Sequence, residues 1–140
     1  MIQNMNRVNF ITLCVADLAR ARAYYEKLGW ELDQEMDVVA FYRTKNQVFG
    51  LFTLDGLAKE TGRDISELKT GAMTLAQNQP SREEVDAAFA HAVACGATPV
   101  REPFETDWGG YSCYVADPDG HLWEFAHNQF SPLDGDGHIA

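Results

Sequence analysis

The chain has 140 residues, the size of one domain or of two small fused modules, and 46% of them are hydrophobic, enough for a sizeable core. Its 11 Lys and Arg against 21 Asp and Glu give a formal net charge of −10. This acidic balance argues against a nucleic-acid or anionic-membrane surface, since both need a basic footprint. We therefore expect no nucleic-acid partner and no membrane association.

The cysteines and the N-terminus bear on the cellular compartment. No stretch approaches the roughly 18 apolar residues of a membrane span, and the first residues lack the apolar region of a signal peptide. Cys14, Cys95 and Cys113 lie far apart, with no CxxC pair. An odd cysteine count without a secretion signal predicts reduced thiols in a cytoplasmic protein, and the spacing excludes a zinc ribbon or a disulfide scaffold.

The first half of the chain reads as strand, helix and three strands. Residues 8–15 alternate apolar and smaller side chains with a period of two, which predicts a strand. Asp17 is placed to cap a helix that ends at Gly29, where a left-handed residue is favoured. Further strands are predicted at 30–32, 38–43 and 47–54, the last two joined by a turn at Lys45-Asn46.

The same order recurs in the second half, so the chain is a tandem repeat of about 65 residues. A strand is predicted at 71–77, then a helix capped by Ser81 and ended by Gly96. Three more strands are predicted at 97–101, 111–116 and 121–127, the last two joined by a turn at 117–120. Between the copies, polar residues 55–70 are either a functional flap or a linker with a helical turn. Residues 131–140 are predicted to be a flexible tail.

Three stretches carry a resemblance to a known family: residues 10–18 (FITLCVADL), 23–29 (AYYEKLG) and 117–125 (DPDGHLWEF). They resemble the vicinal oxygen chelate superfamily, which includes glyoxalase I, bleomycin-resistance proteins, extradiol dioxygenases and fosfomycin-resistance enzymes. The resemblance implies an α+β fold of two tandem βαβββ modules, about 7–54 and 71–128, in one domain spanning 1–130. Such modules form a curved, incomplete barrel with helices outside and a concave cavity for a metal or small ligand. The resemblance also implies a homodimer.

The resemblance also locates four metal-ligand positions. They fall on Phe10, on about Leu51 with Gly50 as the alternative, on about Ala72, and on Glu124. Phe, Leu and Ala have no lone pair to offer a cation. We therefore expect neither a metal nor any other cofactor.

Glu124 is the strongest candidate for a functional side chain. It lies in an apolar predicted strand, where a carboxylate is costly to desolvate unless it is paired. It either anchors a ligand amine or hydroxyl or acts as a general base. The alternative is an inherited ligand position that is now bonded to water, Ser or Tyr groups.

The surroundings of Glu124 depend on the register of the last hairpin. A four-residue turn would place Ala116 opposite His121, Cys113 opposite Glu124 and Tyr111 opposite Ala126. Tyr111, and with it Trp108, would then stack on a flat ligand, or else both belong to the core or a dimer interface.

Further candidates come from both halves of the chain. Tyr42 would share a face with Phe49 if the turn at Lys45-Asn46 has two residues, and either lines the cavity or packs in the core. The candidate ligand contacts are Phe10, Tyr42, Leu51, Trp108, Tyr111 and Glu124. Arg7, Arg43 and Arg101 lie near strand ends, either on the solvated surface or binding an anionic ligand.

Three functional hypotheses follow. The first is metal-independent binding or sequestration of a small, cationic or aromatic molecule in the concave cavity, as in bleomycin-resistance proteins. The second is a glyoxalase-type lyase or isomerase in which Glu124 transfers a proton, with or without a metal. The third is a dimeric scaffold whose cavity has no chemistry.

Overall fold

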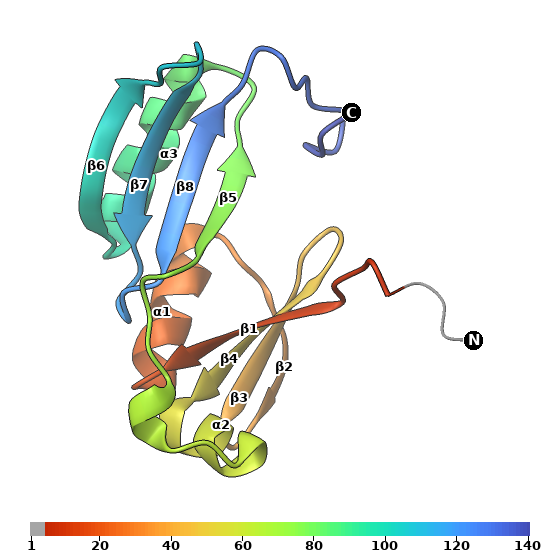
Figure 1. The fold of residues 1–140 in the computed structure, drawn as a ribbon, viewed down its shortest axis with the longest axis vertical. Coiled ribbons are helices and arrows are strands. Elements are labelled where there is room, and N and C mark those ends of the chain that lie inside the picture. Colours follow the sequence, from red (N-terminus) through yellow and green to blue (C-terminus); the bar gives the residue numbers. More distant parts are fainter. Residues whose placement is uncertain (1–4) are drawn as a thin grey trace. The chain divides into compact units, whose positions relative to one another are not determined.

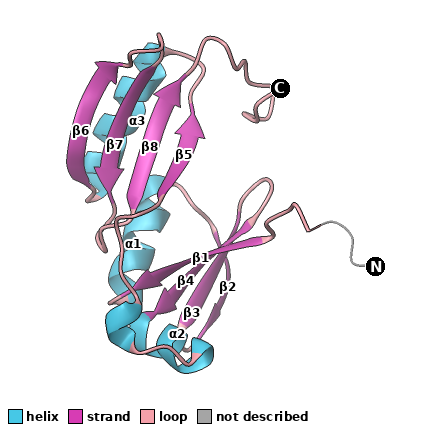
Figure 2. Ribbon diagram, viewed as in Figure 1, coloured by secondary structure: helices cyan, strands magenta, loops and turns pink. Residues whose placement is uncertain are grey.

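The computed structural model describes residues 5–140 and divides the chain into two compact units, with the boundary between Lys69 and Thr70. Each unit holds one four-stranded mixed sheet with a helix packed on it (Figures 1 and 2). This confirms the predicted α+β class and the two βαβββ modules.

The first unit contains a sheet with strand order β1-β4-β3-β2, in which β1 runs parallel to β4 and the other pairs are antiparallel. Helix α1 packs against β3 and β4. The elements in chain order are β1 (Phe10–Val15), α1 (Leu18–Leu28), β2 (Leu32–Met36), β3 (Val39–Arg43) and β4 (Val48–Thr53).

The polar segment after β4 is helical. It contains helix α2 (Leu54–Thr61) and a 3₁₀ turn, η1 (Ile65–Glu67). The Thr53 side chain caps α2 by accepting a hydrogen bond from the Gly56 N–H at 3.1 Å. The segment therefore has structure of its own, and its role as a flap stays a prediction.

The second unit repeats the arrangement with strand order β5-β8-β7-β6, and β5 runs parallel to β8. Helix α3 packs against β6, β7 and β8 (Figure 1). The elements are β5 (Thr74–Asn78), α3 (Arg82–Cys95), β6 (Thr98–Glu105), β7 (Tyr111–Ala116) and β8 (Leu122–His127). Residues 131–140 include a short bridge between Leu133 and Ile139.

The helix ends follow the sequence signals. The Asp17 carboxylate accepts a hydrogen bond from the Arg20 N–H, and the Ser81 hydroxyl accepts one from the Glu84 N–H. Gly29 and Gly96 end the two long helices with φ of 126° and 118°, a region that favours glycine. The predicted helix starts and stops are confirmed.

Each sheet has one face covered by its helix and one face that we call the open face. Alternate strand residues on the helix-covered face are buried, among them Leu13 and Val15 in the first unit and Val115 and Trp123 in the second. Cys14, Cys95 and Cys113, all within the described part of the chain, form no disulfide. No helix in residues 5–140 is long and apolar enough to cross a membrane.

The register of the last hairpin differs from the expected one. Asp117 still pairs with His121, donating its N–H to the His121 carbonyl at 2.9 Å, so only Pro118, Asp119 and Gly120 form the turn. Ala116 therefore lies opposite Leu122 and not opposite His121. A one-residue slip exchanges which side chains share a face. The predicted pairings of Cys113 with Glu124 and of Tyr111 with Ala126 are wrong, because the strands pair one residue beyond the assumed turn.

Candidate functional site

The open face of the second sheet carries a row of polar side chains across three strands, β8, β7 and β6. Glu124 on β8 pairs with Ala76 on β5 and with Tyr114 on β7, and Tyr114 pairs in turn with Arg101 on β6. Paired residues project to the same side of a sheet. Glu124, Tyr114 and Arg101 therefore share one face, with Ser112 in the adjacent row.

Two hydroxyl groups hold the Glu124 carboxylate. The Ser112 hydroxyl donates to Oε2 at 2.6 Å, and the Tyr114 hydroxyl donates to the same oxygen at 3.2 Å. No group among residues 5–140 hydrogen-bonds to Oε1. Both donors stabilise the carboxylate anion and fix its orientation, which leaves one oxygen to accept a bond from a ligand.

The environment of Tyr114 keeps its proton in place. Burial raises the pKa of this phenol above its ordinary value, and the neighbouring Glu124 charge and hydrogen bond raise it further. A protonated phenol donates, so the Tyr114–Glu124 bond keeps its polarity at neutral pH. Ser112, only 1% exposed, supplies the second donor from within the sheet surface.

Arg101 adds a cation to the same face. Its guanidinium carbon lies 3.4 Å from the centre of the Phe104 ring, so the planar group stacks on the ring. Phe104 pairs with Ser112 and so lies on the open face as well. Arg101 is exposed, and no carboxylate of the described residues is within ion-pair distance of it.

Tyr111 and Trp108, two predicted ligand contacts, lie apart from this row. The Tyr111 hydroxyl donates to Asp86 of α3 at 2.7 Å, so the ring lies on the helix-covered face. Trp108 is 53% exposed in the turn before β7, and its ring covers Gly110, where a Cβ would collide with it. The aromatic residues that share the open face with Glu124 are instead Tyr114 and Phe104.

Two predicted contacts in the first unit belong to the core. Leu51 has 0% exposure and pairs with Leu13 and Ala40 on the helix-covered face. Tyr42, 1% exposed, donates its hydroxyl to Glu26 of α1 at 2.8 Å. Tyr42 does share a face with Phe49, as expected, but this is the α1 face.

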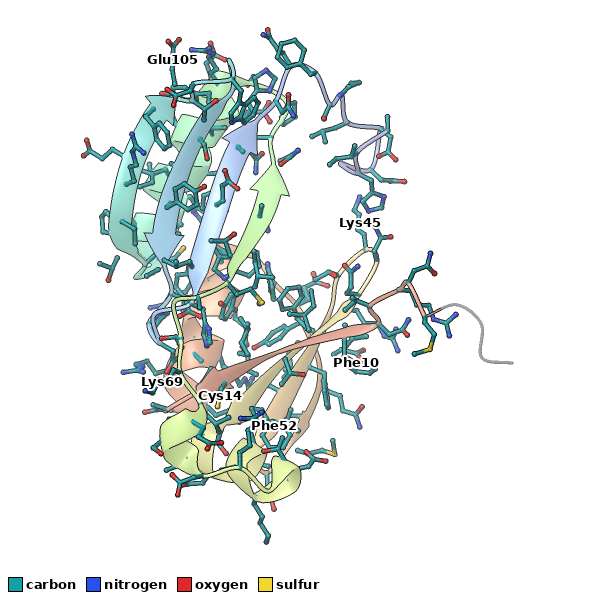
Figure 3. All side chains as sticks on the ribbon, in the orientation of Figure 1. Phe10, Cys14, Lys45, Phe52, Lys69 and Glu105 are labelled. Atoms are coloured by element: carbon teal, nitrogen blue, oxygen red, sulfur yellow. The ribbon has the colours of Figure 1, made fainter. Side chains whose placement is uncertain are left out.

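Phe10 is the predicted contact that the first unit places on its open face. It is 57% exposed, and its ring centre lies 6.0 Å from that of Phe41 in an edge-to-face pair. Gly50 shares this face, between Thr12 and Phe41. Figure 3 shows Phe10 at the start of β1 and Phe52 towards the end of β4; Phe52 shares this face and lies against Gly56 of α2.

The sequence matches the family model of the Glyoxalase/Bleomycin resistance protein/Dioxygenase superfamily over residues 7–125. The chain belongs to this superfamily. No curated protein matches the sequence significantly.

Solved structures of the superfamily have the same fold. A glyoxalase-related enzyme from Fulvimarina pelagi is 31% identical with a TM-score of 0.89, covering 97% of this chain and 98% of its own. A family enzyme from Burkholderia phytofirmans PsJN is 17% identical with a TM-score of 0.74, covering 85% and 96%. A lactoylglutathione lyase from Agrobacterium tumefaciens is 20% identical with a TM-score of 0.69, covering 91% and 97%.

The superfamily's metal-ligand positions do not fit a cation in this chain. Gly50, and not Leu51, lies on the open face of the first sheet, and it has no side-chain donor. In the second unit, Thr74 occupies the place on β5 that Phe10 occupies on β1, whereas Ala72 precedes the strand. Among residues 5–140, no three His, Cys, Asp or Glu side chains come together. Glu124 alone supplies a carboxylate, which is too little for a metal site.

Sequence reasoning found Glu124 and missed Ser112 and Tyr114. A signal for them was present in the sequence. Cys113 and Val115 are the alternate apolar residues of β7, and Trp123 and Phe125 are the alternate apolar residues of β8. If these apolar residues are placed on one face of the sheet, Ser112 and Tyr114 lie on the other face with Glu124. The assumed four-residue turn instead predicts that Cys113 lies opposite Glu124, which the structure contradicts.

Proposed function

We propose that this superfamily member binds a small organic molecule, without a metal, on the open face of its second sheet, with Glu124 as the anchor. The observation that carries the proposal is the one-sided bonding of the carboxylate. Ser112 and Tyr114 both donate to Oε2 and leave Oε1 to a ligand N–H or O–H. A charge-assisted bond to an oriented carboxylate is worth about 1.5–3 kcal/mol.

Two further features support an aromatic or cationic ligand. The Tyr114 ring lies next to the carboxylate in the same row and offers a surface for stacking. The net charge of −10 raises the local concentration of cations near the protein. A small amine with an aromatic ring uses both the carboxylate and the ring.

Titration with benzylamine and tryptamine, followed by thermal shift and calorimetry, tests the anchor. Binding to the folded state raises the melting temperature of the wild-type protein. Glu124→Gln keeps the shape and removes the charge, so it is expected to weaken both amines about tenfold or more. Glu102→Gln, which makes the same charge change at an exposed position of β6, is the control. Equal affinities in the two variants contradict the proposal.

Two tyrosine variants test which face of β7 binds the ligand. Tyr114→Phe removes a donor to Glu124, and Tyr111→Phe removes the bond to Asp86 on the helix-covered face. We expect the first to weaken amine binding about threefold to tenfold, and the second to leave it unchanged. A loss confined to Tyr111→Phe would move the site to the other face.

Proton transfer by Glu124 is the second candidate. It is favoured by the unbonded Oε1, which can accept a proton as well as a hydrogen bond, and by the 31% identity to a glyoxalase-related enzyme. The test is deuterium exchange next to the carbonyl of an α-hydroxy ketone such as hydroxyacetone, followed by NMR. Exchange catalysed by the wild-type protein and lost in Glu124→Gln would favour an enzyme over a binding protein.

The metal-independence and the assembly have direct tests. Elemental analysis of protein purified without a metal-affinity tag is expected to give no stoichiometric zinc, nickel, iron or manganese. Ultracentrifugation is expected to give the mass of a homodimer. Stoichiometric metal would overturn the metal-free proposal.

A further inference from the structure

We propose that the ligand of this face is zwitterionic, with an anionic carboxylate held by Arg101 and a cationic amine held by Glu124. The inference rests on the proposed function, because it takes Glu124 as the first anchor and adds a second. It names the chemical class of the ligand, which Glu124 alone leaves open.

Arg101 is built as a binding group and not as a structural ion pair. Its guanidinium stacks on Phe104 at 3.4 Å, which restrains the side chain, and no group of residues 5–140 hydrogen-bonds to its N–H groups. Two other arginines, by contrast, form ion pairs with carboxylates: Arg22 contacts Glu26 and Glu35, and Arg82 contacts Glu105. A planar guanidinium with free N–H groups binds carboxylate or phosphate oxygens in pairs.

The sheet register sets the distance between the two anchors. Arg101, Tyr114 and Glu124 occupy one row on β6, β7 and β8, so the anchoring strands are two strand spacings apart, roughly 10 Å. Tyr114 lies between them with its ring on the same face. This arrangement fits a small molecule with opposite charges at its two ends and a flat or apolar centre.

The charge of the whole protein favours the same class. A net charge of −10 repels simple anions at long range, so Arg101 alone would collect them poorly. A zwitterion has no net charge to repel, and its two ends meet the cation and the anion that the face offers. Glu124 and Arg101 therefore act together on one ligand.

Three related probes separate the two anchors: 4-(aminomethyl)benzoate, its methyl ester, and 4-methylbenzoate. The first carries both charges, the second only the ammonium group, and the third only the carboxylate. Calorimetry is run on the wild-type protein, Arg101→Gln, Glu124→Gln, Phe104→Leu and Arg43→Gln. Arg43 is the matched control, because it is an exposed strand arginine of the other unit that already contacts Asp33 at 3.4 Å. Melting temperatures verify that each variant is folded.

We expect the wild-type protein to prefer the zwitterion over the ester about tenfold, and Arg101→Gln to abolish this preference without changing the affinity for the ester. Glu124→Gln is expected to weaken both amines and to leave 4-methylbenzoate unchanged. Phe104→Leu removes the stack and is expected to reduce the preference partway, through Arg101. Arg43→Gln is expected to match the wild-type protein.

The outcomes distinguish the two proposals. If the ester binds through Glu124 but the preference for the zwitterion is absent in the wild-type protein, or survives in Arg101→Gln, the zwitterionic class is wrong and the proposed function stands. If the ester binds equally well to Glu124→Gln, the proposed anchor is wrong. If none of the three probes binds the wild-type protein up to its solubility limit, both proposals fall.

Discussion

The two units share one connectivity and differ in the chemistry of their open faces. Glu124 occupies the place on β8 that Gly50 occupies on β4, and Tyr114 the place on β7 that Phe41 occupies on β3. In the next row, Ser112 corresponds to Val39. Each member of the carboxylate site in the second unit thus has an apolar or side-chain-free counterpart in the first.

The helix-covered faces, by contrast, are alike. In each unit a tyrosine on the third strand donates its hydroxyl to a carboxylate on the covering helix: Tyr42 to Glu26, and Tyr111 to Asp86. These faces carry the packing that defines the fold, so they tolerate little change. The open faces do not carry this helix–sheet packing, so the chemical differences between the repeats are concentrated there.

The largest expected effect comes from cutting the core of the first unit. Leu51→Ala removes a fully buried side chain and should lower the free energy of unfolding by about 2–5 kcal/mol. Phe10→Ala, on the exposed open face of the same sheet, should cost much less. Denaturant titration measures both. Equal costs would contradict the placement of Leu51 in the core.

The second prediction transfers the carboxylate to the first unit. Gly50→Glu should lower the free energy of unfolding by about 1–3 kcal/mol, because Phe41 and Val39 supply neither of the two hydroxyls that hold Glu124. A Cβ at this site would also lie 3.3 Å from the Thr12 hydroxyl.

Adding Phe41→Tyr and Val39→Ser to Gly50→Glu should recover part of the loss, by supplying the two hydroxyls that Glu124 has. A triple-mutant cycle, measured by denaturant titration, gives the recovery. If the changes in the free energy of unfolding simply add, the new hydroxyls do not stabilise the new carboxylate. The two units would then differ in more than these three positions.

The third prediction concerns the alkaline limit of the second unit. Burial raises the pKa of the Cys113 thiol to about 11 from its ordinary 9.0. The folded state thus favours the neutral thiol, and this contribution to stability is present below pH 9 and is lost as the pH rises towards 11. Cys113→Ala should flatten the pH dependence of unfolding in that window. Cys14→Ala is the control.

The fourth and smallest effect lies at the acid limit of the first unit. The Arg22 hydrogen bond lowers the pKa of Glu26 below its ordinary 4.5, and the Tyr42 hydroxyl lowers it further. The folded state thus favours the carboxylate, and this stability is present above pH 4.5 and is lost as the pH falls through the lower, folded value. Glu26→Gln should reduce the acid sensitivity of unfolding, measured by thermal melts from pH 6 to 3. An unchanged profile would assign the acid sensitivity to other groups.

The sequence predicts local features well and pairing poorly. Asp17, Ser81, Gly29 and Gly96 mark helix ends through contacts within a few residues, so their signals need no tertiary information. Leu51 and Gly50 are neighbours in an all-apolar strand, where alternation does not reveal which one faces the helix. Tyr42 illustrates the same ambiguity, since both faces of β3 are rich in apolar side chains.

The turn between β7 and β8 has a consequence for comparing relatives. Its three residues decide whether a pair of hydroxyls or a thiol stands next to Glu124, while every strand residue stays the same. Removing one amino acid there, with a three-residue turn kept, would place Cys113 opposite Glu124 and bring Val115 to the same face of the sheet. Loop length is therefore a means of changing reactivity in this architecture, and an alignment that compares residue identities column by column does not detect it.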